Sequence, residues 1–514
     1  MAHYVIGIDA GTESFRAGVF DDKGHALGFG VSQNTTKFRH PGWAEQSPKD
    51  WEFALIDSIK KALSVSGVRP EEIEGVGIDG TSCTVVFLDK GGNPLRDAVM
   101  WMDIRATSEA LDIAATGDAA LDYVGHGNVS PEWYPCKVLW VKRNEQDVYA
   151  KAHTIFEQTD WLAYYLTGER TVNIDTITIR WFYNSHRGGF PKSLYSSIGL
   201  ESVFDKIPNR VVKIGEVVGS LRAEIAEATG LRAGIPVAGG GADAYIGVIG
   251  VNALQAGKLA LITGSSQLQI GISEHEIHAP GIFGSFPDAI LDGLDAVEAG
   301  QISTGTVLRW FTSNFLNEEI VSTAKQRGIS VFDLLNERAE NIPPGAEGLV
   351  VLEHWQGNRT PWTDPESRGV IRGLTLIHGP AHIYRAIMEG IAYGTQVIIA
   401  RMEEVGVTVN EIIACGGATQ SPLWMQIVAD VTNKKVVIPV EQQAVSLGSA
   451  IAAAVAAGIH PSLQSAAESM VKTATTYMPD ISRNRMYKEY VDQYIATYLH
   501  LRDDSHKLVK LIGS

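Results

Sequence analysis

Cysteine is scarce in this chain. Only three cysteines occur among its 514 residues, at Cys83, Cys136 and Cys415, and no two of them form a CxxC pair. Such spacing excludes a disulfide framework and offers no zinc-site pattern. A reducing compartment is the simplest setting for these thiols, so the sequence predicts a cytoplasmic protein.

Long apolar runs and an excess of positive charge are lacking too. The longest apolar run, near Ala450–Ala457, is rich in alanine and too short to span a bilayer. The chain does not open with a basic segment followed by an apolar stretch, so we expect no secretory signal. The formal net charge is −16. Because an acidic surface repels polyanions, we expect neither nucleic acid nor a membrane as a partner.

Two common signatures of phosphate-transferring enzymes are also missing. The chain has no GxxxxGK[ST] motif, and the HRD and DFG motifs of protein kinases are absent. It has instead a unit, present once in each half, in which a turn rich in Gly, Thr and Ser joins two strands. The expected strands are Tyr4–Ile8 and Ser14–Phe20 around the first turn, and Leu259–Ile262 and Gln267–Ile272 around the second.

The length and the repeated unit together predict the domain organisation. A chain of 514 residues with 45% hydrophobic residues suits two or three domains with large cores. We expect a two-lobed α/β protein with lobes at residues 1–251 and 252–514 and a ligand cleft between them. A helix expected at Val445–Gly458 is rich in small residues, which allow two backbones to pack closely.

Both turns can cradle phosphate, because successive backbone N–H groups in a tight turn point towards a common centre. Asp9, at the end of the first strand, is placed to hold Mg²⁺, and Arg16 adds positive charge. A plain hairpin with a capping aspartate explains either turn alone, so the duplication carries the weight. The phosphate-binding candidates are Gly11, Thr12, Ser14, Arg16, Thr263, Gly264 and Ser265.

Two further glycine-rich segments follow expected strands. Gly239–Asp243 ends in a carboxylate at the start of an expected helix, where it can accept the proton of an attacking hydroxyl. A helix N-cap explains this aspartate equally well. The segment Gly416, Gly417 and Ala418 is a candidate contact for a nucleotide, although most such glycine pairs are simple turns.

These segments together resemble the FGGY carbohydrate kinases over nearly the whole chain. The resemblance is carried by YVIGIDAGTESFRAGVFDDKG, LALITGSSQ, VAGGGADAYIGVIGV, GLTLIHGPAHIYRAIMEGIAYGTQ, IIACGGATQSPLWMQIVADVTNKKV and VSLGSAIAAAVAAG. It implies the actin-like ATPase fold, with two ribonuclease-H-like lobes, of which the N-terminal one binds sugar and the C-terminal one binds ATP. It also implies Asp243 as catalytic base, Mg²⁺ near Asp9 and Asp243, and adenosine near Gly416–Ala418.

The stretch Asp79-Gly-Thr-Ser-Cys83-Thr points to one branch of this family. Glycerol kinases carry Gln-Arg-Glu-Thr there and xylulokinases carry Gly-Gln-Met-His-Gly, whereas this stretch is similar to ribulokinases. The segments AVMWMDIRA, VSPEWYPCKVLWVKRN and EHWQGNRTPWTDPESRG are similar to that branch as well. The resemblance therefore implies a ketopentose, ribulose, as the phosphate acceptor.

The sugar contacts implied by the resemblance include one departure from the family pattern. In L-ribulokinases a Lys and a Glu help to bind the ketose, and these positions fall near Arg180 and on Glu298. The planar guanidinium of Arg180 is not equivalent to the ammonium of a lysine. The implied sugar-binding residues are Ser82, Asp103, Arg180, Asp243 and Glu298.

Several alternatives stay open at this point. Xylulokinase, glycerol kinase and tetritol kinase activities belong to the same family, and the arginine leaves the acceptor undecided among them. Rivals from other classes are an actin-like ATPase without sugar transfer and a sugar sensor that has lost turnover. The resemblance adds a homodimer as an expected assembly.

Overall fold

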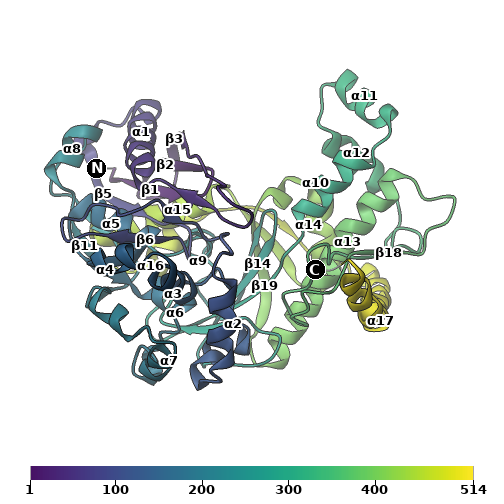
Figure 1. The fold of residues 1–514 in the computed structure, drawn as a ribbon. Coiled ribbons are helices and arrows are strands. Elements are labelled where there is room, and N and C mark those ends of the chain that lie inside the picture. Colours follow the sequence, from purple (N-terminus) through teal and green to yellow (C-terminus); the bar gives the residue numbers. More distant parts are fainter. Residues whose placement is uncertain (1, 513–514) are drawn as a thin grey trace.

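Two β-sheets form the framework of the computed structural model, which describes residues 2–512 (Figure 1). The first sheet has six strands in the order β11-β12-β5-β1-β2-β3. Its strands are β1 (Tyr4–Ala10), β2 (Ser14–Asp21), β3 (Ala26–Gln33), β5 (Ile73–Ile78), β11 (Val217–Ser220) and β12 (Pro236–Ala238).

The second sheet has seven strands in the order β15-β16-β14-β13-β19-β20-β21. Its strands are β13 (Gly257–Thr263), β14 (Gln267–Ser273), β15 (Gly284–Pro287), β16 (Asp295–Gln301), β19 (Val409–Gly416), β20 (Lys435–Pro439) and β21 (Thr473–Tyr477). In each sheet an antiparallel hairpin lies beside a parallel strand, β1–β2 beside β5 and β13–β14 beside β19. The repeated strand–turn–strand unit expected from the sequence is confirmed.

Helices cover both faces of the first sheet. Helix α1 (Pro48–Ser66) packs on β2 and β3, and α15 (Ala444–Ala456) packs on β1 and β5. Side chains alternate between the two faces of a strand, so Ile6 and Ile8 of β1 enter the core under α1 whereas Val5 enters the core between the sheets.

Helices α9 (Asp243–Gly250) and α15 lie between the two sheets. They approach so closely that a Cβ on Gly250 would lie 1.7 Å from the carbonyl oxygen of Ala444, and one on Gly448 would lie 2.1 Å from that of Ile246. The close packing expected for the alanine-rich helix is confirmed. Helix α15 belongs to the second half of the sequence but covers the first sheet. The expected lobes, residues 1–251 and 252–514, therefore remain a proposal.

The outer face of the second sheet carries α13 (Pro380–Glu404) and α14 (Pro422–Thr432), and the long α17 (Ile481–Leu511) packs on both. A smaller sheet in the order β4-β7-β6-β8 lies in the first half. Its strands are β4 (Glu45–Gln46), β6 (Val85–Leu88), β7 (Ala98–Val99) and β8 (Thr154–Glu157). The remaining longer helices are α2 (Thr107–Ala115), α3 (Tyr134–Asn144), α5 (Gln158–Thr167), α10 (Gly305–Asn314), α11 (Glu318–Arg327), α12 (Val331–Glu340) and α16 (Leu463–Met470).

Two elements differ from the sequence expectation. The stretch 106–168 reads as mostly helical in sequence, yet it contains β8, which is short, fully buried and paired with β6. Helix α17 is missed because its polar residues outnumber its buried ones. All three cysteines are free and buried. Within residues 2–512 we find no helix that is both long and apolar enough to cross a membrane.

The packing of α15 on the first sheet gives a testable prediction. A Cβ on Gly77 would lie 1.9 Å from the carbonyl oxygen of Ser449, so Gly77→Ala forces α15 away from β5. We expect a loss of about 3 kcal/mol in the free energy of unfolding, as for an overpacked core. Urea unfolding measures the loss, and Gly379→Ala, whose Cβ meets nothing within 4 Å, is the control. Equal stability of the two variants would contradict this packing.

Candidate active site

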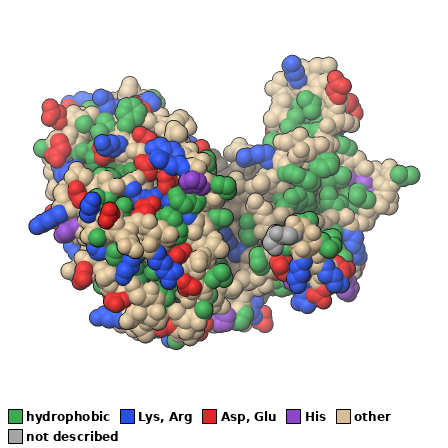
Figure 2. All heavy atoms as spheres, in the orientation of Figure 1, with side chains coloured by type: hydrophobic (Ala, Val, Ile, Leu, Met, Phe, Trp, Pro, Cys, Tyr) green, Lys and Arg blue, Asp and Glu red, His purple; other side chains and the backbone are tan. Residues whose placement is uncertain are grey.

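A cavity of about 290 Å³ lies between the two halves of the molecule, where the space-filling view shows the surface hollowed (Figure 2). We call it the central cavity. Residues of both halves line it: Thr12, Thr81, Ser82, Cys83, Trp101, Glu132, Trp133, Arg180, Asp243, Ser266, Leu268, Phe283, Glu298 and Arg359. Four of the five residues expected to bind sugar are among them, because only Asp103 lies elsewhere.

Asp243 is the first residue of α9 and enters the central cavity. Its backbone N–H donates to Gly80 O at 2.9 Å, and its Oδ1 accepts from the Ala244 N–H at 2.7 Å. The Oδ2 atom accepts no hydrogen bond from any residue of the described range 2–512. One oxygen therefore serves the helix end while the other is free for a ligand. Burial raises the pKa of Asp243 to about 6, so the carboxylate is charged above neutral pH and can still accept a proton.

Arg180 and Glu298 meet across the halves in the wall of the central cavity. Nη2 of Arg180 donates to both carboxylate oxygens of Glu298, at 3.0 and 2.9 Å. The Tyr245 hydroxyl donates to Oε2 of Glu298 at 2.6 Å. Burial lowers the pKa of Arg180, but the neighbouring Glu298, Tyr245 and Cys83 together raise it by more, so the net pKa is raised and the guanidinium stays charged. The pair fixes a rigid polar edge on the cavity.

The first turn reaches the central cavity through Thr12. The Trp101 indole Nε1–H donates to the Thr12 hydroxyl at 2.9 Å, and the Gln46 side chain donates to Thr12 O at 2.8 Å. Arg16 Nη1 lies 3.7 Å from Asp9 and donates to the Gln443 side chain at 2.5 Å. Gly11, Ser14 and Arg16 thus flank the turn but do not line the cavity.

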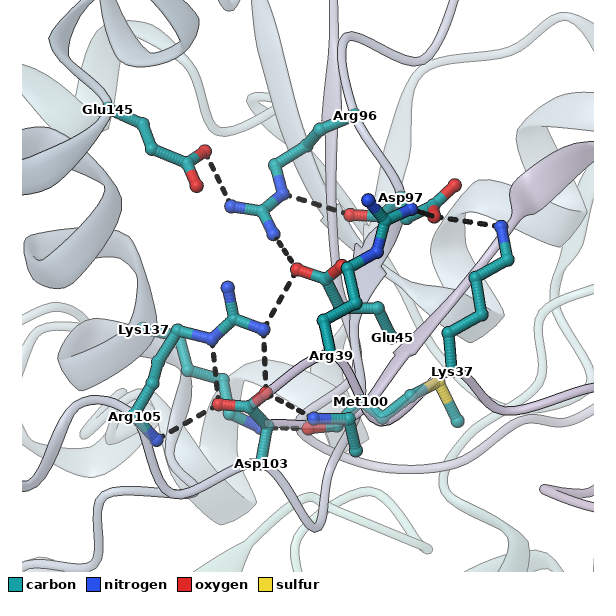
Figure 3. A network of polar contacts seen from close by, with 11 residues as sticks. Lys37, Arg39, Glu45, Arg96, Asp97, Met100, Asp103, Arg105, Lys137 and Glu145 are labelled. Atoms are coloured by element: carbon teal, nitrogen blue, oxygen red, sulfur yellow. Dashed lines mark hydrogen bonds and ion pairs between the residues drawn. The ribbon is translucent and has the colours of Figure 1, made fainter. Parts of the chain in front are cut away.

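Asp103 lies outside the central cavity, in a buried network of charges (Figure 3). Its carboxylate accepts from Arg105 Nε at 2.8 Å, from Arg105 Nη2 at 2.7 Å and from the Ala44 N–H at 2.6 Å. Arg105 also donates to Glu45 at 2.9 Å and stacks over the Trp43 ring. With its oxygens committed and no exposed surface, Asp103 cannot contact a sugar, and we remove it from the proposed substrate set.

A second cavity of about 570 Å³, the flanking cavity, opens beside the first. It is lined by Gly264, Ser265, Gly305, Leu308, Arg309, Ser330, Phe332, Asp333, Asn336, Tyr384, Gly417, Ala418, Gln420, Ser421 and Trp424. Ser265 faces this cavity whereas the next residue, Ser266, faces the central one. The second turn therefore separates the two cavities and is in reach of both.

Thr263 and Gly416 shape the flanking cavity without lining it. The Thr263 hydroxyl donates to Cys415 O at 2.7 Å and accepts from the Ala418 N–H at 3.1 Å, which ties the second turn to the 416–418 segment. Gly416 has φ of 93°, and a Cβ there would lie 1.9 Å from Thr263 O. Glycine is required at this position for both reasons.

Two of the predicted residues fit a Mg²⁺ site completed by a ligand. Burial and the neighbouring charge of Asp243 raise the pKa of Asp9 to about 7, although Arg16 opposes the rise. A cation would relieve this repulsion, and Mg²⁺ is commonly held by one or two carboxylates together with phosphate oxygens. Within residues 2–512 no group of three or more His, Cys, Asp or Glu side chains could hold a metal ion alone. The pair fits Mg²⁺ only as a partner of a bound phosphate.

Several cavity residues escaped the sequence reasoning. Trp101, Glu132, Phe283 and Arg359 line the central cavity although they come from loops that carry no glycine-rich turn. Trp101, Glu132 and Arg359 lie in segments that are similar to ribulokinases, but nothing in those segments singles out these side chains. Arg359 also lies in the polar tract Gly357–Pro361, which sequence alone leaves as a hinge or a surface turn. Its guanidinium lies over the Phe283 ring, 5.4 Å from the centroid.

Comparison with family models covers most of the chain. The model described as "FGGY family of carbohydrate kinases, N-terminal domain" matches residues 4–250, and the corresponding C-terminal model matches residues 259–457. A protein named ribulokinase from Geobacillus thermodenitrificans is 33% identical, over 97% of this chain and 94% of its own length. An FGGY carbohydrate kinase domain-containing protein of Xenopus laevis is 32% identical, over 97% of both chains.

The fold also matches solved structures. The crystal structure of xylulose kinase from Rhodospirillum rubrum superposes with a TM-score of 0.85 at 26% identity, covering 98% of this chain and 100% of that one. The expectation of the actin-like ATPase fold with two α/β lobes is confirmed.

The buried position of Asp103 gives a second prediction. Asp103→Asn removes the charge that faces Arg105, and we expect the free energy of unfolding to fall by about 3 kcal/mol because a buried ion pair is broken. Asp97→Asn is the matched control, since Asp97 pairs with the partly exposed Lys37 and Arg39. Such surface pairs contribute about 1 kcal/mol or less. Urea unfolding of both variants decides, and a smaller loss for Asp103→Asn than for Asp97→Asn would refute the structural role.

Proposed function

The chain belongs to the FGGY family of carbohydrate kinases, and from this premise we propose that it transfers the γ-phosphate of ATP to the terminal hydroxyl of a ketopentose, ribulose. Asp243 acts as the catalytic base. The two lobes, residues 1–251 and 252–514, supply the sugar side and the nucleotide side of the reaction.

One observation carries the proposal. Asp243, with one carboxylate oxygen free, lines the same cavity as Thr12 of the first turn and Ser266 of the second. A hydroxyl bound against Asp243 would thus lie beside both phosphate-binding turns. Positioning of this kind supplies most of the rate in phosphoryl transfer.

The side chains divide the work as follows. Asp243 accepts the proton of the attacking hydroxyl, and Ser82, Arg180 and Glu298 orient the rest of the sugar in the central cavity. Arg359 adds a donor on the opposite half. The nucleotide lies along the flanking cavity against Gly417 and Ala418, and its phosphates reach the turn at Gly264 and Ser265. The first turn is flanked by Gly11, Ser14 and Arg16, which do not line the cavity. The 416–418 segment is held by Gly416 and by the hydrogen bonds of Thr263.

Asp9 and Asp243 would hold Mg²⁺ through their carboxylates once ATP is bound. In this place Mg²⁺ would supply positive charge against the phosphates during transfer. Arg16, whose Nη1 lies 3.7 Å from the Asp9 carboxylate, adds positive charge near the same place.

Ribulose is supported as the acceptor by the relatives and by the lining. The protein named ribulokinase that matches 97% of this chain is the main support. The central cavity offers both acidic and guanidinium groups, which suit a chain of adjacent hydroxyl and carbonyl groups. A cytoplasmic location remains a prediction from the cysteine spacing, and a homodimeric assembly remains a prediction from the family resemblance.

Replacement of the base tests the mechanism. We expect Asp243→Asn to fold normally and to lose about 10³-fold in kcat, because the amide cannot accept the hydroxyl proton. A coupled assay of ADP release measures turnover. Asp480→Asn, at the N-cap of α17, is a control for the loss of a carboxylate at a helix start, and its kcat should match that of the unmodified protein. Near-normal turnover of Asp243→Asn would remove Asp243 from the mechanism.

A panel of acceptors tests the substrate. We expect ADP release to depend on sugar and kcat/KM to be highest with ribulose, compared with xylulose, erythritol and glycerol. A better acceptor among the other three would transfer the proposal to that sugar. ADP release that is the same with and without any acceptor would instead identify an ATPase that does not transfer phosphate to sugar.

A further inference from the structure

Cys83 has a strained backbone in the wall of the central cavity. Its φ is 64°, in the left-handed region that residues other than glycine rarely adopt. Such a conformation is energetically unfavourable and persists only where the surroundings enforce it. This turn matters for the cavity, because Cys83 and the two residues before it, Thr81 and Ser82, all line it. The surroundings that enforce this turn are therefore part of the site.

On one side, the Cys83 N–H is held by a buried carboxylate. It donates to Oε2 of Glu157 at 2.8 Å, and the Trp181 indole donates to Oε1 of the same group at 2.6 Å. Glu157 is the last residue of β8, directly paired with Val85 of β6, and is fully buried. Its position is thus set by the small sheet and not by the turn that it holds.

On the other side, the Cys83 carbonyl is held by a buried ammonium. Nζ of Lys137 donates to Cys83 O at 2.9 Å, to Met100 O at 2.6 Å and to Trp101 O at 3.1 Å. An ammonium has three donors, so all of them are used. Lys137 lies on α3, has no exposed surface and is drawn beside Met100 in Figure 3. Burial lowers the pKa of Lys137, while the neighbouring acidic groups oppose the change.

This lysine joins segments that the sequence keeps apart. The carbonyls it binds belong to the 81–83 turn and to the 100–101 segment, and Trp101 in turn donates its indole N–H to Thr12 of the first phosphate-binding turn. A single ammonium therefore connects the wall of the cavity to the turn that faces the phosphate. Burying an ammonium costs free energy unless its donors are satisfied. A lysine at this position is therefore explained by the carbonyls that it binds and not by the space that it fills.

We propose that Lys137 and Glu157 are positioning residues that clamp the 81–83 turn and thereby set how tightly and how selectively the sugar is bound. This inference rests on the proposed kinase function and deepens it. Neither side chain lines the central cavity, so both act through the backbone of Cys83. Asp243 is held on α9 by the packing of α15, and its N–H donates to Gly80 O, a carbonyl that neither Lys137 nor Glu157 contacts. We therefore expect the clamp to act on sugar binding more than on the chemical step.

Lys137→Met tests the clamp, because methionine keeps the bulk of the side chain and removes its donors. We expect the KM for sugar to rise about tenfold or more, since hydrogen bonds from a charged donor are stronger than neutral ones. The kcat and the KM for ATP should change by less than about threefold, well under one tenfold step of 1.4 kcal/mol. Lys142→Met is the matched control, because Lys142 is on the same helix and donates to a backbone carbonyl, Gly199 O at 2.5 Å, away from the cavity.

A second measurement does not depend on turnover. Amide hydrogen exchange without sugar should be faster at residues 82–84 and 101 in Lys137→Met than in the unmodified protein, and unchanged there in Lys142→Met. If the unmodified protein releases no ADP in response to sugar, the proposed function fails, and the exchange data still decide whether Lys137 holds the turn. Unchanged exchange at these residues would overturn the clamp.

Glu157→Gln provides an independent variant where Lys137→Met does not fold. Its single amide oxygen can serve the Cys83 N–H or the Trp181 indole but not both, so we expect a similar rise in the KM for sugar with little change in kcat. A fall in kcat at constant KM, in either variant, would assign these residues to the chemical step and overturn the proposal.

Discussion

The contact between α9 and α15 is the constraint on which the rest of the structure depends. Two helices from opposite halves of the sequence meet with almost no side chain between them, because Gly250 and Gly448 leave room for the facing carbonyls. Each helix also lies against one of the two sheets. The helix that begins with Asp243 is thus held by both halves at once, and any movement of one half against the other must take place around it.

The placement of charge follows from this arrangement. The fold places Asp9, near the end of β1, close to Asp243 at the start of α9. Burial raises the pKa of both carboxyl groups, and the charge of Asp243 raises that of Asp9 further. The energetic cost of that proximity is the reason a cation with phosphate oxygens would bind there. Arg180 and Glu298, in contrast, carry opposite charges and form an ion pair between the two halves, so neither charge is left unpaired. The two carboxylates of Asp9 and Asp243 thus lie where we propose that phosphate binds, and the neutralised Arg180–Glu298 pair lies where we propose that the sugar binds.

Local sequence signals were sufficient where a short segment carries its own geometry. Neighbouring residues predict the turns at Thr12 and Thr263 and a helix start at Asp243, and the structure brings Thr12 and Asp243 into one cavity. The duplication of the turns and the family resemblance were needed to give these residues a role. Asp103 was misplaced because the likeness of its segment to a family says nothing about which way one side chain points. Arg359 was missed because its role depends on a loop that folds back over Phe283, a contact between distant segments that no local pattern encodes.

The covered thiols described above have a practical consequence. Burial raises the pKa of the Cys83 thiol to about 12, so the group stays a neutral thiol although the residue lines the central cavity. Only a thiolate reacts readily with an alkylating reagent. Alkylation of Cys83 should therefore be slow in the folded protein, and its rate would report how often the wall of the cavity opens locally.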